Sequence, residues 1–132
     1  MTSLLISGLL GSMIFFVFVV SPTVFSSLPS KQSSKFLRKI FPRMFLFGFI
    51  LSIMGSLLAY YENLIGSFFL LLCISILFIL NRNFLTPLIN KYRDLQLEGN
   101  KSSSKIFKLL HLFSVIIFVT TMICLVIILI FI

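Results

Sequence analysis

Charged residues are scarce in this sequence. They make up 11% of the 132 residues, against about 25% in an ordinary soluble domain, whereas hydrophobic residues make up 59%. The mean hydropathy is +1.18, and the apolar residues form continuous runs rather than the alternation of a half-buried strand. This composition excludes a soluble globular domain. It predicts an integral membrane protein built from helices, because a helix satisfies its own backbone hydrogen bonds in lipid.

Side chains that carry enzyme chemistry are also rare. The sequence has one histidine, two cysteines and three acidic residues, and their spacing matches no metal site. It contains no GxSxG motif, no P-loop and no paired carboxylates. We therefore expect no enzymatic activity, no metal and no cofactor. A membrane enzyme that holds haem or a porphyrin through His111 is the alternative.

Lysine and arginine are absent from most of the chain. All 11 lie between positions 31 and 43 or between positions 82 and 108. Under the positive-inside rule these stretches lie in the cytoplasm, and both termini and the turn at Glu62 lie outside. Topology and attraction to anionic headgroups explain the net charge of +8, so the lipid bilayer is the expected partner and nucleic acid is not. The side chains predicted to reach the headgroups are Arg38, Arg43, Arg82, Arg93 and Lys108.

Four apolar runs are long enough to cross a bilayer, which requires about 20 residues in a helix. Together with their polar extensions they predict helices over about residues 3–28, 36–61, 64–95 and 105–131. Only a few residues around Glu62 separate the second helix from the third. We expect one all-α domain over residues 1–132, a bundle of four transmembrane helices in two hairpins, with two long basic cytoplasmic loops.

Small residues recur at helical spacing in the first two predicted helices. Such rows let helix backbones approach each other closely in lipid. We expect the first helix to pack on the second through them, and pairing of two copies of the chain is the alternative. The residues concerned are Gly8, Gly11, Gly48, Ser52, Gly55 and Ser56.

The two basic stretches resemble each other. One begins with Ser21 and Pro22, the other with Thr86 and Pro87, and each continues to the letters SSK. Duplication of one hairpin would explain the match and would relate the two hairpins by an axis along the membrane normal. The shared letters are few and low in complexity, so coincidence is the alternative.

Polar residues gather near the predicted cytoplasmic ends of the third and fourth helices. Those of the third helix are spaced four, three and four apart, which places them on one face of a helix that continues past Leu80. If this face meets the fourth helix, one polar cluster results. Its members are Asn83, Thr86, Pro87, Asn90, Asp94, His111 and Ser114.

This predicted cluster favours a small transporter or a subunit that binds a solute or a lipid. A histidine one turn inside a helix end also fits a simple packing or interfacial role. A structural subunit of a larger membrane complex, or a homo-oligomer, would need only the helix surfaces. The sequence leaves these functions open.

Four short motifs follow one another along the chain: SPTVFSSLP, FLRKIFPRMF, NRNFLTPLINKYRD and FKLLHLFSV. Their order resembles the family called domain of unknown function 4149, small bacterial membrane proteins that are similar to eukaryotic transmembrane protein 205. The resemblance implies a four-helix protein of the bacterial inner membrane and implies no particular activity. Leu88 departs from the pattern, because a basic residue is expected at that position. The matching residues are Pro22, Phe25, Phe41, Pro42, Phe45, Asn83, Thr86, Pro87, Asn90, Arg93, Asp94, Leu110, His111 and Ser114.

Overall fold

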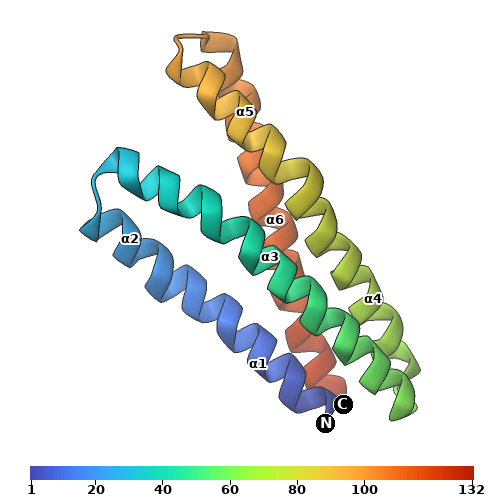
Figure 1. The fold of residues 1–132 in the computed structure, drawn as a ribbon. Coiled ribbons are helices and arrows are strands. Elements are labelled where there is room, and N and C mark those ends of the chain that lie inside the picture. The colour runs from blue at the N-terminus through green and yellow to red at the C-terminus, as the bar shows by residue number, and fades with distance from the viewer.

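Four long helical segments make up the protein (Figure 1). The computed structural model describes all 132 residues and contains no strand. The segments are Thr2–Ser27, Ser30–Tyr61, Ile65–Leu97 and Lys101–Phe131, and each is long and apolar enough to cross a membrane. The all-helical class and the four potential spans are thereby confirmed.

Two of these segments contain a short π-helical turn. The first consists of α1 (Thr2–Phe15), η1 (Phe16–Val20) and α2 (Ser21–Ser27), and the third of α4 (Ile65–Leu80), η2 (Asn81–Leu85) and α5 (Thr86–Leu97). The second and fourth segments are the single helices α3 (Ser30–Tyr61) and α6 (Lys101–Phe131).

The two long loops expected from the sequence are in fact mostly helix. Helix α3 begins at Ser30 rather than near residue 36, and α6 begins at Lys101 rather than near residue 105. The side chain of Asn100 accepts a hydrogen bond from the backbone N–H of Ser103 and so caps α6. Serines in the first turn and the lysines and arginines that follow are compatible with helix, so the basic stretches extend the membrane helices.

A proline follows each π-helical turn at the same position. The backbone N–H of Ser21 donates to Phe16 O before Pro22, and that of Thr86 donates to Asn81 O before Pro87. A proline has no N–H, and its ring crowds the carbonyl four residues earlier. The wider turn accommodates both effects while the helix continues. This shared irregularity favours duplication of the hairpin.

The second and third segments pack most closely, and small residues of α3 make this possible. A Cβ atom added to Gly48 would lie 2.6 Å from Phe78 Cζ of α4, and one added to Gly55 would lie 3.4 Å from Leu71 Cδ1. The Ser56 hydroxyl donates to Phe68 O of α4 at 3.3 Å.

The expected packing of the first helix on the second through small residues therefore needs correction. Ser52, like the small residues beside it, is buried, but Gly48 faces α4 alone, whereas a Cβ added to Gly55 would lie 3.3 Å from Leu5 Cδ2 of α1 as well as 3.4 Å from Leu71 of α4. Gly8 and Gly11 of α1 are exposed, and nothing lies within 4 Å of the Cβ that either could carry. The small residues of α3 thus bring it close to α4, and Gly55 also admits α1, whereas the glycines of α1 take no part in this packing.

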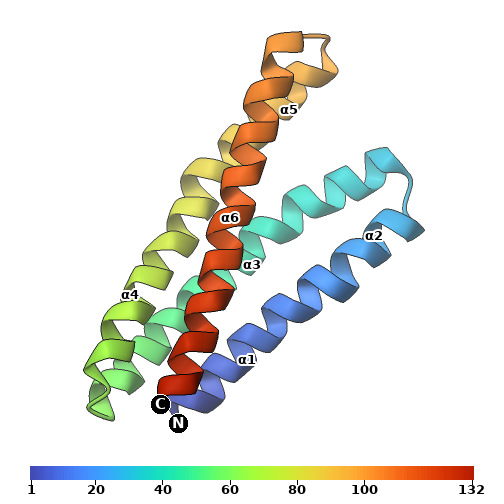
Figure 2. The same ribbon diagram turned by 180° about the vertical axis from the view of Figure 1, so that it is seen from behind.

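Both chain ends and the turn at Glu62–Leu64 lie at one end of the molecule (Figures 1 and 2). Glu62 Oε1 lies 2.6 Å from the ammonium group of Met1 and accepts from the backbone N–H of Thr2 at 3.3 Å. The hydrogen bond from the ammonium group, followed by that from Thr2, lowers the pKa of Glu62. The buried core is Ile6, Leu9, Met13, Phe45, Ala59, Leu71, Ile74, Phe78, Leu125 and Ile128.

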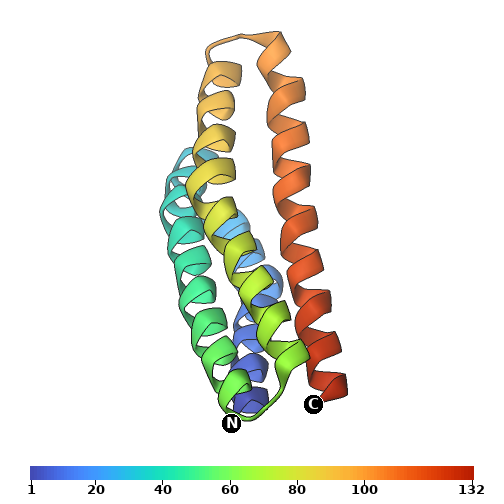
Figure 3. The same cartoon turned by 90° about the vertical axis from the view of Figure 1, so that its right-hand side faces the viewer.

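At the opposite end the segments separate into two arms. Helices α2 and α3 diverge from α5 and α6 (Figure 1), and α4–α5 lies between α3 and α6 (Figure 3). The arm made of α1, α2 and α3 and the arm made of α5 and α6 therefore face each other across an opening.

Replacing Gly48 with alanine should destabilise the protein, because the buried ring of Phe78 must move to admit the methyl group. Overpacking of this kind costs about 1–3 kcal/mol, which should appear as earlier loss of helical circular dichroism on titration with sodium dodecyl sulfate. Gly11→Ala is the control: nothing crowds its added methyl group, so it should leave the unfolding free energy unchanged or raise it by up to about 1 kcal/mol, the gain of alanine over glycine in a helix. Equal effects of the two substitutions would contradict the packing described.

Candidate functional site

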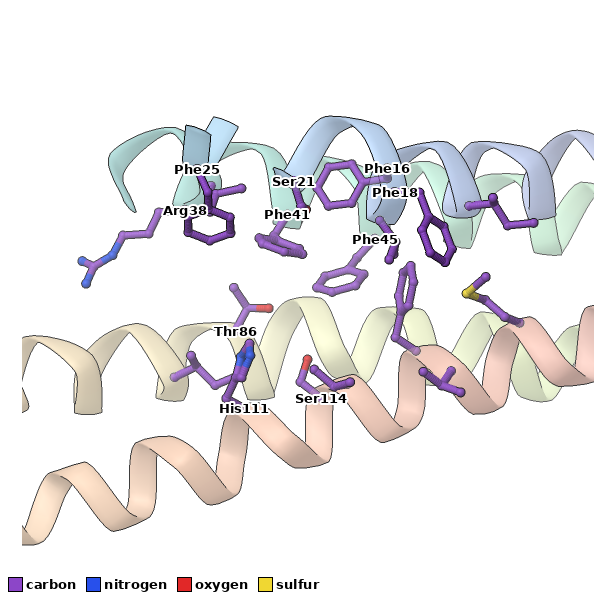
Figure 4. A pocket seen from close by; sticks show the side chains of 18 of the residues that line it. Phe16, Phe18, Ser21, Phe25, Arg38, Phe41, Phe45, Thr86, His111 and Ser114 are labelled. Atoms are coloured by element: carbon purple, nitrogen blue, oxygen red, sulfur yellow. The ribbon is translucent and has the colours of Figure 1, made fainter. Parts of the chain in front are cut away.

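An open cleft of about 1130 Å³ lies between the two arms. Helices α1, α2 and α3 form one wall, and α5 and α6 form the other, with side chains from both walls directed into the space (Figure 4). Phe107 and Ile127, the two ends of the α6 wall, are 20 positions apart, or about 30 Å at about 1.5 Å per residue. The cleft therefore extends over a length comparable to the hydrocarbon core of a bilayer.

The lining of the cleft changes along its length. Toward the end that holds the termini it is wholly apolar, with residues such as Leu10, Ile14 and Ile127. Aromatic rings follow in the middle, together with Ser21, Thr86 and Ser114, and polar and basic side chains line the open end, which we call the mouth and which also contains Phe107. The aromatic residues are Phe16, Phe18, Phe25, Phe41, Phe45, Phe107 and Phe118, and the polar or basic residues of the mouth are Ser30, Ser33, Ser34, Arg38, Asn90, Arg93 and His111.

Two arginines and no carboxylate line the mouth. Arg38 comes from α3 and Arg93 from α5, on opposite walls. Arg38 Nη2 donates to Asp94 Oδ1 at 2.6 Å, and this ion pair joins the two arms. Asp94 itself is 53% exposed and does not line the cleft.

Arg93 has no acidic partner and is held by neutral groups. Its Cζ atom lies 5.3 Å from the ring centroid of Phe107, a cation–π contact, and its Nη1 atom donates to Gln96 Oε1 at 2.9 Å. The imidazole of His111 stacks on the same ring, with centroids 6.0 Å apart. Phe107 thus positions both Arg93 and His111 at the mouth.

A buried hydrogen-bond network supports the wall formed by α5 and α6. The Ser114 hydroxyl donates to Asn81 Oδ1 at 2.6 Å, and Asn81 Nδ2 donates to Ser114 O at 3.4 Å. The Thr86 hydroxyl donates to Asn81 O at 2.8 Å. Asn81 is 1% exposed, so this amide is fully committed to holding the π-helical turn against α6.

The structure brings together only part of the polar cluster that the sequence predicts. Asn90 and His111 both line the mouth, and Thr86 and Ser114 meet through Asn81. The exposed residues Asn83 and Pro87 do not join them. The π-helical turn displaces Asn83, which lies within it. In α5 the residues that line the cleft are Thr86, Ile89, Asn90 and Arg93, and this face lies beside the predicted stripe and leaves Pro87 outside.

Asn81 is the functional residue that sequence reasoning misses. It directly follows a long apolar run and was not part of the predicted stripe, since an α-helical period does not align it with Thr86. A spacing of five residues before a Thr-Pro pair is the signal that identifies it, because a π turn places residues i and i+5 together.

The five predicted headgroup anchors divide into two groups. Arg43 and Lys108 are exposed, and Arg82 donates to Asn83 Oδ1 at 3.0 Å. Arg38 and Arg93 instead line the cleft. Two of the five predicted anchors are therefore also cleft residues, and contact of the five with headgroups stays a prediction.

No group of three or more histidine, cysteine or acidic side chains could hold a metal ion. For haem, His111 is the one imidazole that faces the cleft. Met122, which also lines it, is 11 residues further along α6, about 16 Å away at about 1.5 Å per residue. That separation is too great for these two side chains to bind opposite faces of one haem iron. Haem held by His111 alone stays the untested alternative to the expected absence of a cofactor.

Comparison with protein families gives one match. The family model described as domain of unknown function (DUF4149) matches residues 4–98, from α1 to the end of α5. The match ends before α6. The sequence motifs that resemble this family continue into α6, where they include Leu110, His111 and Ser114. No curated protein and no solved structure matches the chain.

Asn81→Ala should destabilise the protein by about 1–2 kcal/mol, because both hydrogen bonds between Asn81 and Ser114 are lost and hydrogen bonds between membrane helices contribute on this scale. Asn83→Ala is the matched control: it removes an exposed amide from the same turn and should cost less than about 0.5 kcal/mol. Both values can be measured by titration with sodium dodecyl sulfate. Equal unfolding free energies of the two variants would show that the hydrogen bonds of Asn81 do not stabilise the protein.

Proposed function

The chain belongs to the family described as domain of unknown function (DUF4149), and we propose that it is a multi-pass membrane protein that binds an amphiphilic lipid in its cleft. The apolar chain of the lipid occupies the deep part, and the headgroup lies at the mouth. The observation that carries this proposal is the change of lining from aliphatic to aromatic to polar along one cleft.

The size of the cleft suits a lipid better than a small solute. Its volume of about 1130 Å³ lies above the roughly 300–1000 Å³ that is usual for drug-sized ligands. Several lining residues, including Phe18 and Phe25, are also strongly exposed. A lipid could therefore enter sideways from the bilayer without passing through water.

Selectivity must come from the mouth. Lipid tails are as apolar as leucine side chains, so the deep part of the cleft cannot by itself prefer one lipid over another. The mouth adds hydroxyl, amide, imidazole and guanidinium groups at one end of the cleft. This arrangement supports a binding protein or carrier subunit, and no step of the proposal requires enzymatic chemistry.

The mouth lies on the cytoplasmic side in this proposal. All 11 lysines and arginines lie within residues 31–43 or 82–108, on the parts of the chain that lead to and from the connections at the open end (Figure 1). The positive-inside rule places that end in the cytoplasm. For a bacterial protein the membrane concerned is the inner membrane.

Filling the cleft should abolish lipid retention. Val115 and Val119 line the cleft one turn apart on α6, and replacing both with tryptophan places two indole rings in its middle. Native mass spectrometry after purification in mild detergent should show a bound lipid on the wild type and a loss of about tenfold or more in the double variant.

The control replaces Ile116 and Thr120 with tryptophan. These residues lie beside the first pair on α6, are exposed, and do not line the cleft. This control should retain lipid as the wild type does. Equal retention by both double variants would place the bound lipid on the outer surface and would refute the proposal.

The proposed sidedness predicts the labelling of engineered cysteines. In a chain with Cys73 and Cys124 replaced by alanine, Asn63→Cys at the turn beside the termini should react with an impermeant maleimide on intact cells. Ser102→Cys, near the start of α6, should react only after the cells are opened. The reverse pattern would show that the mouth faces outward.

A further inference from the structure

We propose that the mouth of the cleft is selective for an anionic phosphate headgroup, and that Asp94 competes with this headgroup for Arg38. The inference rests on the proposed function, because it names the class of lipid that the cleft would accept. The selectivity follows from the charged side chains at the mouth, whereas lipid binding alone would need no charge there.

The mouth has an excess of positive charge that is open to a ligand. Arg38 and Arg93 approach it from opposite walls, and no carboxylate lines it. Arg93 contacts only neutral groups, Phe107 and Gln96. Because a guanidinium group matches the oxygens of a phosphate in geometry as well as in charge, two of them facing one space favour a phosphate over a neutral headgroup.

Asp94 holds Arg38 in the way that a ligand oxygen would. The Arg38–Asp94 distance is 2.6 Å, and the side chains are 31% and 53% exposed. An exposed ion pair of this kind is weak, so a phosphate that also accepts from Arg93 can displace the carboxylate. A ligand must therefore bind Arg38 more tightly than Asp94 does in order to occupy the mouth.

A hydroxyl group completes the arrangement on the α3 wall. Ser34 lies one turn before Arg38, which places both on the same face of the helix. It lines the mouth, and its side chain donates no hydrogen bond within the protein. Its hydroxyl is therefore available to a phosphate oxygen held by Arg38.

The test measures retention of phosphatidylglycerol and phosphatidylcholine by native mass spectrometry, with the purified protein exposed to equal amounts of each. Both lipids carry a phosphate, but only the first has a net negative charge. The wild type should retain phosphatidylglycerol about fivefold better or more, because the excess positive charge of the mouth repels the choline ammonium group of phosphatidylcholine, whereas phosphatidylglycerol carries no such cation. Equal retention would overturn the proposed selectivity and leave lipid binding standing, whereas retention of neither lipid would overturn lipid binding itself.

Two matched pairs of variants separate recognition at the mouth from general surface charge. Asp94→Asn should raise retention of phosphatidylglycerol about threefold or more by releasing Arg38, and Glu98→Gln, which removes an equal charge nearby, should change it less than about twofold. Arg38→Gln should lower it about fivefold, and Lys39→Gln, the adjacent residue that does not line the cleft, should lower it less than about twofold. Equal effects within either pair would overturn the inference.

Inorganic phosphate distinguishes a lipid headgroup from a free anion. It should leave the thermal unfolding temperature of the wild type and of Asp94→Asn unchanged, because without an acyl chain it gains nothing from the cleft. A stabilisation by phosphate that depends on Arg38, together with no retention of phosphatidylglycerol, would overturn the assignment of the mouth to a lipid.

Discussion

The structure depends on one constraint: a backbone polar group in the hydrocarbon core of a membrane must be hydrogen-bonded within the protein. Each segment is helical over its whole length for this reason, even where the sequence contains a proline. At Pro22 and Pro87 the helix continues because a π-helical turn precedes the proline. Pro42 lies within α3 without such a turn, so the proline alone does not produce it. The preceding hydroxyl residue, Ser21 or Thr86, is what the two π-helical sites share.

The same constraint explains where the polar side chains lie. Asn81 is buried among apolar neighbours and uses both its amide nitrogen and its amide oxygen on Ser114. His111 instead lines the mouth. Two buried groups, the hydroxyl of Thr2 and Nε of Arg82, have no hydrogen-bond partner. The small residues of α3 then draw α3 and α4 together at the other end. Because α3 is drawn to α4 on one side, the arms diverge on the other, and the cleft is the result.

Much of this fold could be predicted from the sequence. Run length alone identifies four spans, and the helical spacing from Asn83 to Asp94 correctly predicts a helix that continues past Leu80. The starts of α3 and α6 were missed, because serine-rich, basic segments have the composition of loops. Gly11 and Gly48 each belong to a row of small residues at helical spacing. Gly48 is packed against a neighbouring helix and Gly11 is not, and this difference depends on the arrangement of the helices. The role of Asn81 was hidden because it depends on a change of helical period.

The two π-helical turns have different mechanical consequences. In the third segment the turn is fixed to α6 by directional hydrogen bonds through Asn81. At the corresponding place in the first segment stands Phe16, whose ring meets that of Phe41 at 5.1 Å, edge to face. An edge-to-face pair prefers this geometry, but it contains no hydrogen bond and adds only about 0.5–1.5 kcal/mol beyond the burial of the rings. The wall that carries Arg93 and His111 is thus tied together by hydrogen bonds and the opposite wall by ring packing, so a change in the width of the cleft requires no hydrogen bond of the second wall to break.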